Sequence, residues 1–152
     1  MRLALHQPDI AGNVGTIMRL AACFSIPLDI VMPCGFPASD KQLRRSAMDY
    51  AEAAEIHTHI NSDAFFAVQS DAGHRVVLLT SHGDTRLPDM EFTPQDTLLL
   101  GSESAGVPDH IHKAVAFRIN IPMAPGFRSL NIAVAAGIAL SEALRQTGLY
   151  PA

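Results

Sequence analysis

The sequence predicts an α/β fold in which a mostly parallel sheet is flanked by helices. Short apolar runs alternate with segments of helical spacing along the 152 residues. Two runs, 75–80 (RVVLLT) and 97–100 (TLLL), are almost continuously apolar, as in strands that are buried on both faces. Strands that alternate with helices are typical of a parallel sheet with helical crossovers. No internal repeat, linker or low-complexity segment interrupts the pattern, so we expect a single domain over residues 1–152.

Each expected element rests on a short stretch of sequence. Strands are expected over 2–6, 28–32, 55–60, 75–80, 97–100 and 116–121, and helices over 16–24, 40–47, 62–70, 108–114 and 129–147. In the first helix, Ile17, Leu20, Ala21 and Phe24 recur at helical spacing. The glycine-containing segment 9–15 before this helix is expected to be a turn-rich loop.

The segment 119–140 is the part around which the rest of the fold is expected to be arranged. It opens with the end of an apolar run, breaks at two prolines and Gly126, and continues from Ser129, which is well placed to cap a helix. Residues 130–140 carry no charge and are rich in alanine. A helix that is apolar all round must be buried on most of its faces, so we expect this helix to be covered on more than one side.

Composition limits the class of protein. Hydrophobic residues make up 48% and charged residues 17% of the chain, as in a soluble globular protein. No apolar run has the length of a membrane span and the amino-terminal MRLALHQPDI is unlike a signal peptide, so we expect a cytoplasmic protein without membrane association. Cys23 and Cys34 form neither a disulfide framework nor a metal-binding spacing. The net charge of −4 argues mildly against a nucleic-acid partner, although local basic clusters count for more than the total.

Three glycine-containing loops leave strands at the carboxyl edge of the expected sheet, where ligands bind in open α/β folds. The first holds Asn13, Gly15 and Arg19, the second is 101–106 (GSESAG), and the third is 122–131. Neither the phosphate-binding loop nor the dinucleotide fingerprint is present. The loops could present backbone groups to a ligand, or they could be no more than tight turns between strands and helices.

Taken together, these loops resemble the three motifs of the SpoU RNA ribose methyltransferases, which belong to the wider class of trefoil-knotted methyltransferases. The matching stretches are Asn13-x-Gly15-x-x-x-Arg19, 98–108 (LLLGSESAGVP) and 119–144 (INIPMAPGFRSLNIAVAAGIALSEAL). Within the family, 6–15 (HQPDIAGNVG) and 41–50 (KQLRRSAMDY) are most similar to the tRNA wobble-position 2′-O-methyltransferases, which modify cytidine and modified uridine.

The resemblance implies a fold, a methyl donor and an assembly. The carboxyl-terminal segment would thread through a loop to form a deep trefoil knot, a feature that is otherwise nearly absent from proteins. S-adenosylmethionine would be held bent among the three knot loops. It would be contacted, largely through backbone groups, by Leu79, Gly101, Ile121 and Ser129, with Leu130 nearby. The family acts as a homodimer, which would give the helix at 130–140 a place to bury its second face.

Arg19 is the catalytic residue that the resemblance implies, for attack of a ribose 2′-hydroxyl on the donor methyl. A guanidinium stays protonated in proteins, so our hypothesis is that Arg19 orients a phosphate or stabilises the developing alkoxide. The alternative is a surface arginine that lies over the first helix. Arg19 is the only charge in that otherwise apolar helix, which favours the functional interpretation.

Three other polar residues of the motifs, Asn13, Glu103 and Asn131, are candidates for contact with the substrate RNA. Glu103 could instead pin the loops, pair with a basic group of a partner chain, or be a carboxylate at a helix start. Asn131 and Ser129 could shape the donor and ribose site, or could simply cap the helix.

The expected RNA partner is a tRNA anticodon stem-loop. The basic residues that are candidates to hold it are Lys41, Arg44, Arg45 and Arg128. For the first three, a solvated helix face is the ordinary explanation. Two His-x-His pairs, 57–59 and 110–112, lack a third ligand at a useful spacing, so we take them as surface residues and expect no metal.

The resemblance to this family therefore implies an S-adenosylmethionine-dependent tRNA ribose 2′-O-methyltransferase. It departs from the common third motif at Ala133, where a serine is frequent, and at Ser141, where a close relative carries tyrosine. Neither departure touches Arg19. The alternatives are ribosomal RNA 2′-O-methylation, a non-catalytic RNA-binding module of the same fold, and a small-nucleotide-binding protein.

Overall fold

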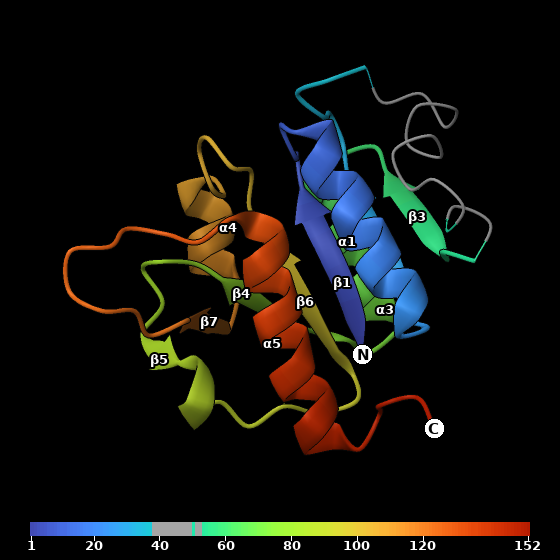
Figure 1. Ribbon diagram of the computed structural model, residues 1–152. Helices are drawn as coiled ribbons and strands as arrows, with labels where there is room; N and C mark the ends of the chain where they lie inside the picture. The colour runs from blue at the N-terminus through green and yellow to red at the C-terminus, as the bar shows by residue number, and fades with distance from the viewer. Residues whose placement is uncertain (38–49, 51–52) are drawn as a thin grey trace.

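Parallel strands form the centre of the protein. The computed structural model describes residues 1–37, 50 and 53–152. Its strands are β1 (Arg2–His6), β2 (Leu28–Val31), β3 (Ile56–His59), β4 (Arg75–Leu79), β5 (Thr85–Arg86), β6 (Asp96–Leu100) and β7 (Phe117–Asn120). They pair in parallel in the order β3-β2-β1-β6-β4-β7-β5 (Figure 1). The predicted α/β class with a mostly parallel sheet is confirmed.

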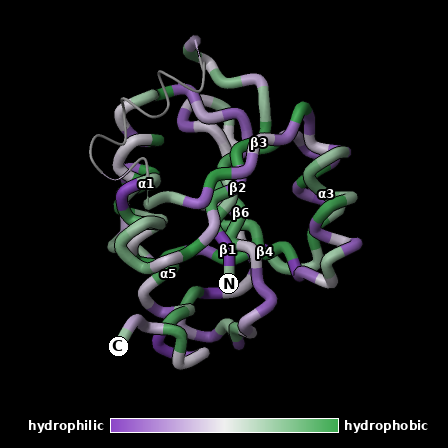
Figure 2. The backbone as a smooth tube through the Cα atoms, turned by 90° about the vertical axis from the view of Figure 1, so that its right-hand side faces the viewer, coloured by the Kyte–Doolittle hydropathy of each residue, from purple (hydrophilic) through white to green (hydrophobic). Residues whose placement is uncertain are grey.

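Helices cover both faces of this sheet. They are α1 (Ala11–Cys23), α3 (Ser62–Asp71), α4 (Asp109–Ala114) and α5 (Ile132–Thr147), with a short 3-10 helix, η2 (Leu87–Asp89). Figure 1 shows α1 and α5 on the near face and α3 and α4 on the far face. Figure 2, a side view, shows the sheet between α3 and the pair α1 and α5. The helix expected over 40–47 lies outside the described residues.

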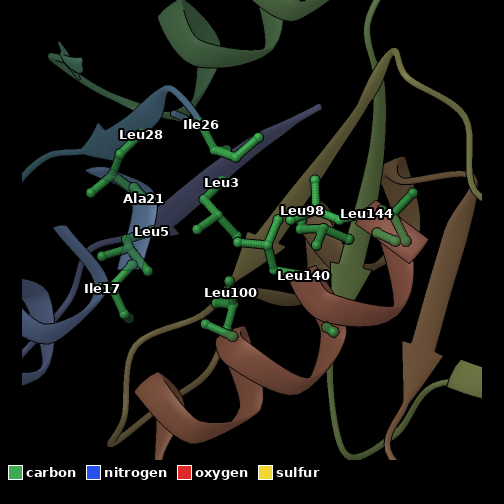
Figure 3. Close-up of a cluster of buried hydrophobic side chains, with 14 of the residues drawn as sticks. Leu3, Leu5, Ile17, Ala21, Ile26, Leu28, Leu98, Leu100, Leu140 and Leu144 are labelled. Atoms are coloured by element: carbon green, nitrogen blue, oxygen red, sulfur yellow. The ribbon is translucent and has the colours of Figure 1, made fainter. Parts of the chain in front are cut away.

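The larger hydrophobic core lies between the sheet and the pair α1 and α5 (Figure 3). Leu3 of β1 and Leu98 of β6 are fully buried in this core together with Leu140 of α5. Their neighbours Ala4 and Leu99 point the other way, into a second cluster beneath α3 and α4. Because every residue of β6 is buried, the prediction of a strand covered on both faces is confirmed.

α1 begins at Ala11, before the predicted start at residue 16. Two glycines in the segment 9–15 disfavour a helix locally, and for this reason the sequence predicts a loop there. In the structure, Val14 and Gly15 are buried and α1 packs along α5, so tertiary packing overrides the local preference. As a result, Asn13 lies in the first turn of a helix and not in a loop.

α5 begins at Ile132, and its cap is Asn131, not the predicted Ser129. The side-chain oxygen of Asn131 accepts hydrogen bonds from the backbone N–H groups of Ala133, at 2.9 Å, and Val134, at 3.3 Å. One amide oxygen thus satisfies two of the N–H groups that a helix start leaves unpaired. Ser129 stays in the exposed segment ahead of the helix.

Only one face of α5 is buried within the described part of the chain. The buried residues of this helix are Ala136, Ala139, Leu140, Ala143 and Leu144. On another face, Val134 and Ile138 are 51% and 40% exposed. An apolar stripe of this helix therefore remains open to solvent in the single protomer, and its burial against a second protomer stays a prediction.

β7 lies inside a loop of the chain. It pairs with β4 on one side and with β5 on the other, and β4 also pairs with β6, so the segment 80–95 runs around β7. The contact is close, because a Cβ atom on Gly83 would lie 2.4 Å from the carbonyl carbon of Ile119. α4 precedes β7 and α5 follows it, on opposite faces of the sheet. The chain therefore passes from one face of the sheet to the other at β7, and the knot itself stays a prediction.

Candidate active site

A pocket of about 890 Å³ opens at the carboxyl edge of the sheet. The segments that follow β4, β6 and β7 reach it, together with residues at the start of α1 and α5. Its volume is that of a site for an organic ligand of moderate size. Of the predicted site residues that the structure describes, all except Arg19 line the pocket: Asn13, Leu79, Gly101, Glu103, Ile121, Arg128, Ser129, Leu130 and Asn131.

The loop after β6, residues 101–106, closes on itself beside the pocket. The N–H of Ser102 donates to the carbonyl of Gly106 at 3.0 Å, and the N–H of Gly106 donates back to Ser102 at 2.9 Å. A Cβ atom on Gly101 would lie 2.4 Å from the carbonyl carbon of Gly106. Only glycine at 101 therefore allows this closure. The paired bonds between Ser102 and Gly106 leave Glu103 and Ser104 at the tip of the loop.

Side chains of the three motifs form one chain of hydrogen bonds. Glu103 accepts hydrogen bonds from the backbone N–H of Asp9, at 2.8 Å, and from the side-chain amide of Asn13, at 3.0 Å. The side-chain amide of Asn131 donates to the oxygen of Asn13 at 3.0 Å. In this protomer Glu103 thus pins the first motif to the second, and Asn13 joins both to the cap of α5. Contacts of these residues with RNA stay predictions.

Asp9, which the sequence analysis does not single out, also belongs to this network. Its carboxylate accepts hydrogen bonds from the hydroxyl and from the backbone N–H of Ser104. The hydroxyl, and then the N–H, lower the pKa of Asp9 below its ordinary value. Asp9 belongs to the stretch 6–15 that resembles the wobble-position enzymes, but nothing in that stretch predicts its contact with Ser104.

Arg19 lies away from this network, on the exposed side of α1. Its Nη2 donates to the phenolic oxygen of Tyr50 at 3.3 Å, and its Cζ lies 4.6 Å from the centre of the Tyr50 ring. Arg19 is not among the described residues that line the pocket of its own chain. Tyr50 is a second residue that sequence reasoning misses, and nothing in the sequence around it predicts this contact.

The sequence profile of the SpoU rRNA Methylase family matches residues 1–141 of this chain. The chain belongs to this family. The resemblance to this family, predicted from the three motifs, is thereby confirmed. Residues of all three motifs line one pocket, as a family member needs in order to bind a ligand there.

Members of the SpoU family with assigned activities are similar over nearly the whole chain. The chain is 47% identical over 146 residues to a tRNA (cytidine(34)-2′-O)-methyltransferase of Beijerinckia indica, covering 96% of this chain and 91% of that protein. It is 47% identical over 148 residues to a protein of the same name in Ancylobacter novellus, covering 97% of this chain and 94% of that one.

Solved structures of the SpoU class share the fold. One, described as "Structural insights into the 2-OH methylation of C/U34 on tRNA", has a TM-score of 0.89 at 36% identity and covers 95% of this chain and 94% of its own. Another is the AdoMet-bound rRNA methyltransferase of Sinorhizobium meliloti, with a TM-score of 0.84 at 31% identity. It covers 95% of this chain, whereas this chain matches 55% of it.

The remaining predicted residues of this SpoU member are three basic residues and the two histidine pairs, and His112 of the second pair lines the pocket. Lys41, Arg44 and Arg45 fall outside the described residues. His57 is exposed, as predicted, but His59 is buried, because its side chain lies beneath α3 and makes a 2.7 Å hydrogen bond to a carboxylate of β2.

The described residues contain neither a cluster of metal ligands nor a helix that could span a membrane. No group of three or more histidine, cysteine, aspartate or glutamate side chains in the described ranges has the arrangement of a metal site. In the same ranges, no helix combines the length and the hydropathy that crossing a bilayer demands.

Proposed function

We propose that this protein transfers a methyl group from S-adenosylmethionine to the ribose 2′-oxygen of the wobble nucleotide of tRNA, a cytidine or modified uridine. One observation carries the proposal: relatives named tRNA (cytidine(34)-2′-O)-methyltransferase match at least 96% of the chain at 47% identity. The pocket at the carboxyl edge of the sheet supports it, because it gathers the residues that the family motifs assign to the donor.

The pocket suits the donor chemically. Leu79, Ile121 and Leu130 offer apolar surface to a purine ring, and Ser129 offers a hydroxyl at the exposed rim. The close turn at Gly101 leaves backbone groups free of side chains, so that peptide N–H and C=O groups can face a ligand. Such a mixture of apolar walls and a few polar groups is typical of sites for small organic ligands.

The donor supplies a methyl group that is already activated by a positively charged sulfur. The chain has to align the ribose oxygen with that carbon, and alignment alone contributes much of the acceleration in such transfers. Arg19 is the catalytic residue of this proposal. Its guanidinium orients a phosphate of the RNA or stabilises the developing alkoxide, since it cannot accept the proton itself. As the oxygen–carbon bond forms, the carbon–sulfur bond breaks, S-adenosylhomocysteine leaves and the hydroxyl proton passes to water.

Because Arg19 does not line the pocket of its own chain, a second protomer has to bring it there. The apolar stripe of Val134 and Ile138 on α5, with Leu130 ahead of it, is where two protomers pack, since stripes of this kind mark protein contacts. Packing on this stripe forms a homodimer, buries the second face of α5, and places Arg19 of one protomer near the pocket of the other.

The RNA partner is the anticodon stem-loop of tRNA, which places the activity in the cytoplasm. Arg128 lines the pocket and is exposed, so it is positioned to meet a phosphate beside the target ribose. Lys41, Arg44 and Arg45 supply further positive charge, and the dimer combines the charges of both chains. This local concentration offsets the net charge of −4.

The test is transfer of labelled methyl to total tRNA, followed by nucleoside analysis of the anticodon loop. Label in a 2′-O-methylated wobble nucleoside is expected. Label in a base would overturn the reaction type, and label in ribosomal RNA alone would overturn the substrate. Retained binding of S-adenosylhomocysteine without transfer to any RNA would favour a non-catalytic RNA-binding module.

A further inference from the structure

Asp9 and the tip of the 101–106 loop hold each other by reciprocal hydrogen bonds. The Asp9 carboxylate accepts from the Ser104 N–H at 3.0 Å and also from the Ser104 hydroxyl. The Asp9 N–H donates in return to the Glu103 carboxylate at 2.8 Å. Asp9 therefore uses both its side chain and its backbone on two successive residues of the loop. We call this pairing of Asp9 with Glu103 and Ser104 the clamp.

The clamp holds the tip of the 101–106 loop, whereas the bonds within the loop hold its base. The base of the loop is closed by the paired backbone bonds between Ser102 and Gly106. Glu103 and Ser104 lie beyond that pair, and Ser104 is exposed. Gly101 and Gly106 line the pocket, so a shift of the tip changes the shape of the pocket wall.

Asp9 is itself fixed from behind by the loop that follows β2. The N–H of Gly35 donates to the carbonyl of Pro8 at 2.9 Å. A Cβ atom on Gly35 would lie 2.9 Å from Oδ1 and 3.1 Å from Cα of Asp9. The carboxylate thus rests against backbone that leaves no room for a side chain, which restricts its position.

We propose that Asp9 is a positioning residue for the methyl donor: it holds the 101–106 loop in the shape that binds the donor, without touching the donor itself. The identity of the donor rests on the proposed function, but the clamp does not. A loop that is ordered before binding loses less conformational entropy when the ligand arrives. Loss of the clamp is therefore expected to weaken donor binding while the chemical step of the bound donor stays nearly unchanged.

The experiment compares Asp9→Ala with Asp71→Ala, which removes an exposed carboxylate from the end of α3. S-adenosylhomocysteine binding is measured by calorimetry, and kcat and the donor KM by methyl transfer to tRNA. Asp9→Ala is expected to raise both the Kd and the donor KM by about threefold to tenfold, with kcat within about twofold of the parent protein. Asp71→Ala is expected to change neither.

Two further variants separate positioning from folding. Gly35→Ala keeps the carboxylate but displaces it, and it is expected to raise the Kd in the same direction as Asp9→Ala. Asp9→Asn keeps one acceptor oxygen and is expected to restore part of the affinity. Amide hydrogen exchange of residues 101–106 without any donor is expected to be faster in Asp9→Ala than in the parent, with the core strands unchanged.

The outcomes distinguish the clamp from the proposed function. Unchanged Kd and unchanged exchange of the 101–106 loop in Asp9→Ala would overturn the clamp and leave the methyltransferase proposal standing. Faster exchange and weaker S-adenosylhomocysteine binding in Asp9→Ala would support the clamp. If at the same time the parent protein methylates no RNA, the proposed function is overturned. An equal loss of kcat in Asp9→Ala at saturating donor would also contradict a positioning role.

Discussion

The guanidinium of Arg19 lies over the ring of Tyr50, with Cζ 4.6 Å from the ring centre and Nη2 3.3 Å from the phenolic oxygen. A long side chain on the exposed side of a helix ordinarily samples many rotamers. Stacking on an aromatic ring restricts it. The residue to which we assign the chemistry is therefore held by a residue outside the motifs.

The first prediction concerns this contact. Tyr50→Ala removes the ring and is expected to lower kcat by about twofold to fivefold, the effect of an exposed cation–π contact. Tyr50→Phe keeps the ring and loses only a long hydrogen bond, so it is expected to retain most activity. Single-turnover methylation of tRNA measures both. In an Arg19→Ala background, Tyr50→Ala is expected to have no further effect, and an additive loss would show that Tyr50 acts elsewhere.

The second prediction concerns Gly101. In Gly101→Ala the new methyl group would overlap the backbone of Gly106, 2.4 Å away, so the 101–106 loop has to open. S-adenosylhomocysteine binding is expected to weaken by at least about tenfold, measured by calorimetry, because the pocket wall moves. Gly12→Ala is the control, since a Cβ atom there meets nothing within 4 Å. Equal affinities of the two variants would contradict the assigned wall of the pocket.

β6 and β5 illustrate which parts of the fold the sequence predicts. β6 ends in three consecutive leucines and is buried on both faces, so its apolar run identifies it. β5 has two residues, too few for any period, and only its pairing with β7 defines it. The predicted starts of α1 and α5 are wrong for a related reason. Tertiary packing decides where α1 begins and the side chain of Asn131 decides where α5 begins, whereas local propensity decides neither.

The candidate site divides in the same way. Glycine and proline residues mark the loops that line the pocket, whereas the assignment of Gly101 and Ser129 to the donor comes from the family resemblance and stays a prediction. The contacts of Asp9 and Tyr50 cannot be predicted from the sequence, because their partners Ser104 and Arg19 are 95 and 31 positions away along the chain. A contact across such a distance leaves no trace in the spacing of residues.

The third prediction concerns charge and salt. The slope of log K against log salt is negative, and each phosphate contact that is lost makes it less steep by about 0.7 to 0.9. Arg128→Ala is expected to show this change in tRNA binding, measured by filter binding at several salt concentrations. Arg145→Ala removes an equal charge from the far end of α5, where Arg145 pairs with Glu142 at 2.8 Å, and is expected to leave the slope unchanged. Identical slopes for both variants would exclude a phosphate contact at Arg128.

The fourth prediction concerns acid stability. Hydrogen bonds from Arg145, and then from Gln146, lower the pKa of Glu142 from 4.5 to about 2. A carboxyl group with a lowered pKa stabilises the folded state fully above its unfolded value. That contribution is lost as the pH falls from about 4.5 toward 2.

Glu142→Gln is the variant that tests this contribution. Arg145 is exposed and Glu142 is half-buried at the surface of α5, so solvent screens the pair and the variant is expected to lower the free energy of unfolding at pH 6 by less than about 1 kcal/mol. Near pH 2 the difference is expected to vanish. Urea unfolding at both pH values measures it, and a difference that grew toward low pH would contradict the assignment.

The fifth prediction tests the shared site of the homodimer. Arg19→Ala protomers have an intact pocket, and Gly101→Ala protomers have an intact guanidinium. If Arg19 serves the pocket of the partner, a mixed dimer of the two contains one complete site. At a donor concentration well below the KM of the parent, the mixed dimer is expected to methylate tRNA at about half the rate of the parent. Under the same conditions Arg19→Ala dimers are expected to be slower than the parent by roughly 100-fold or more, and Gly101→Ala dimers by at least about tenfold. Co-expression with two affinity tags isolates the mixed dimer. If the mixed dimer is no more active than the Arg19→Ala or Gly101→Ala homodimer, Arg19 acts in the site of its own chain. Each protomer of the mixed dimer would then carry one defect in its own site.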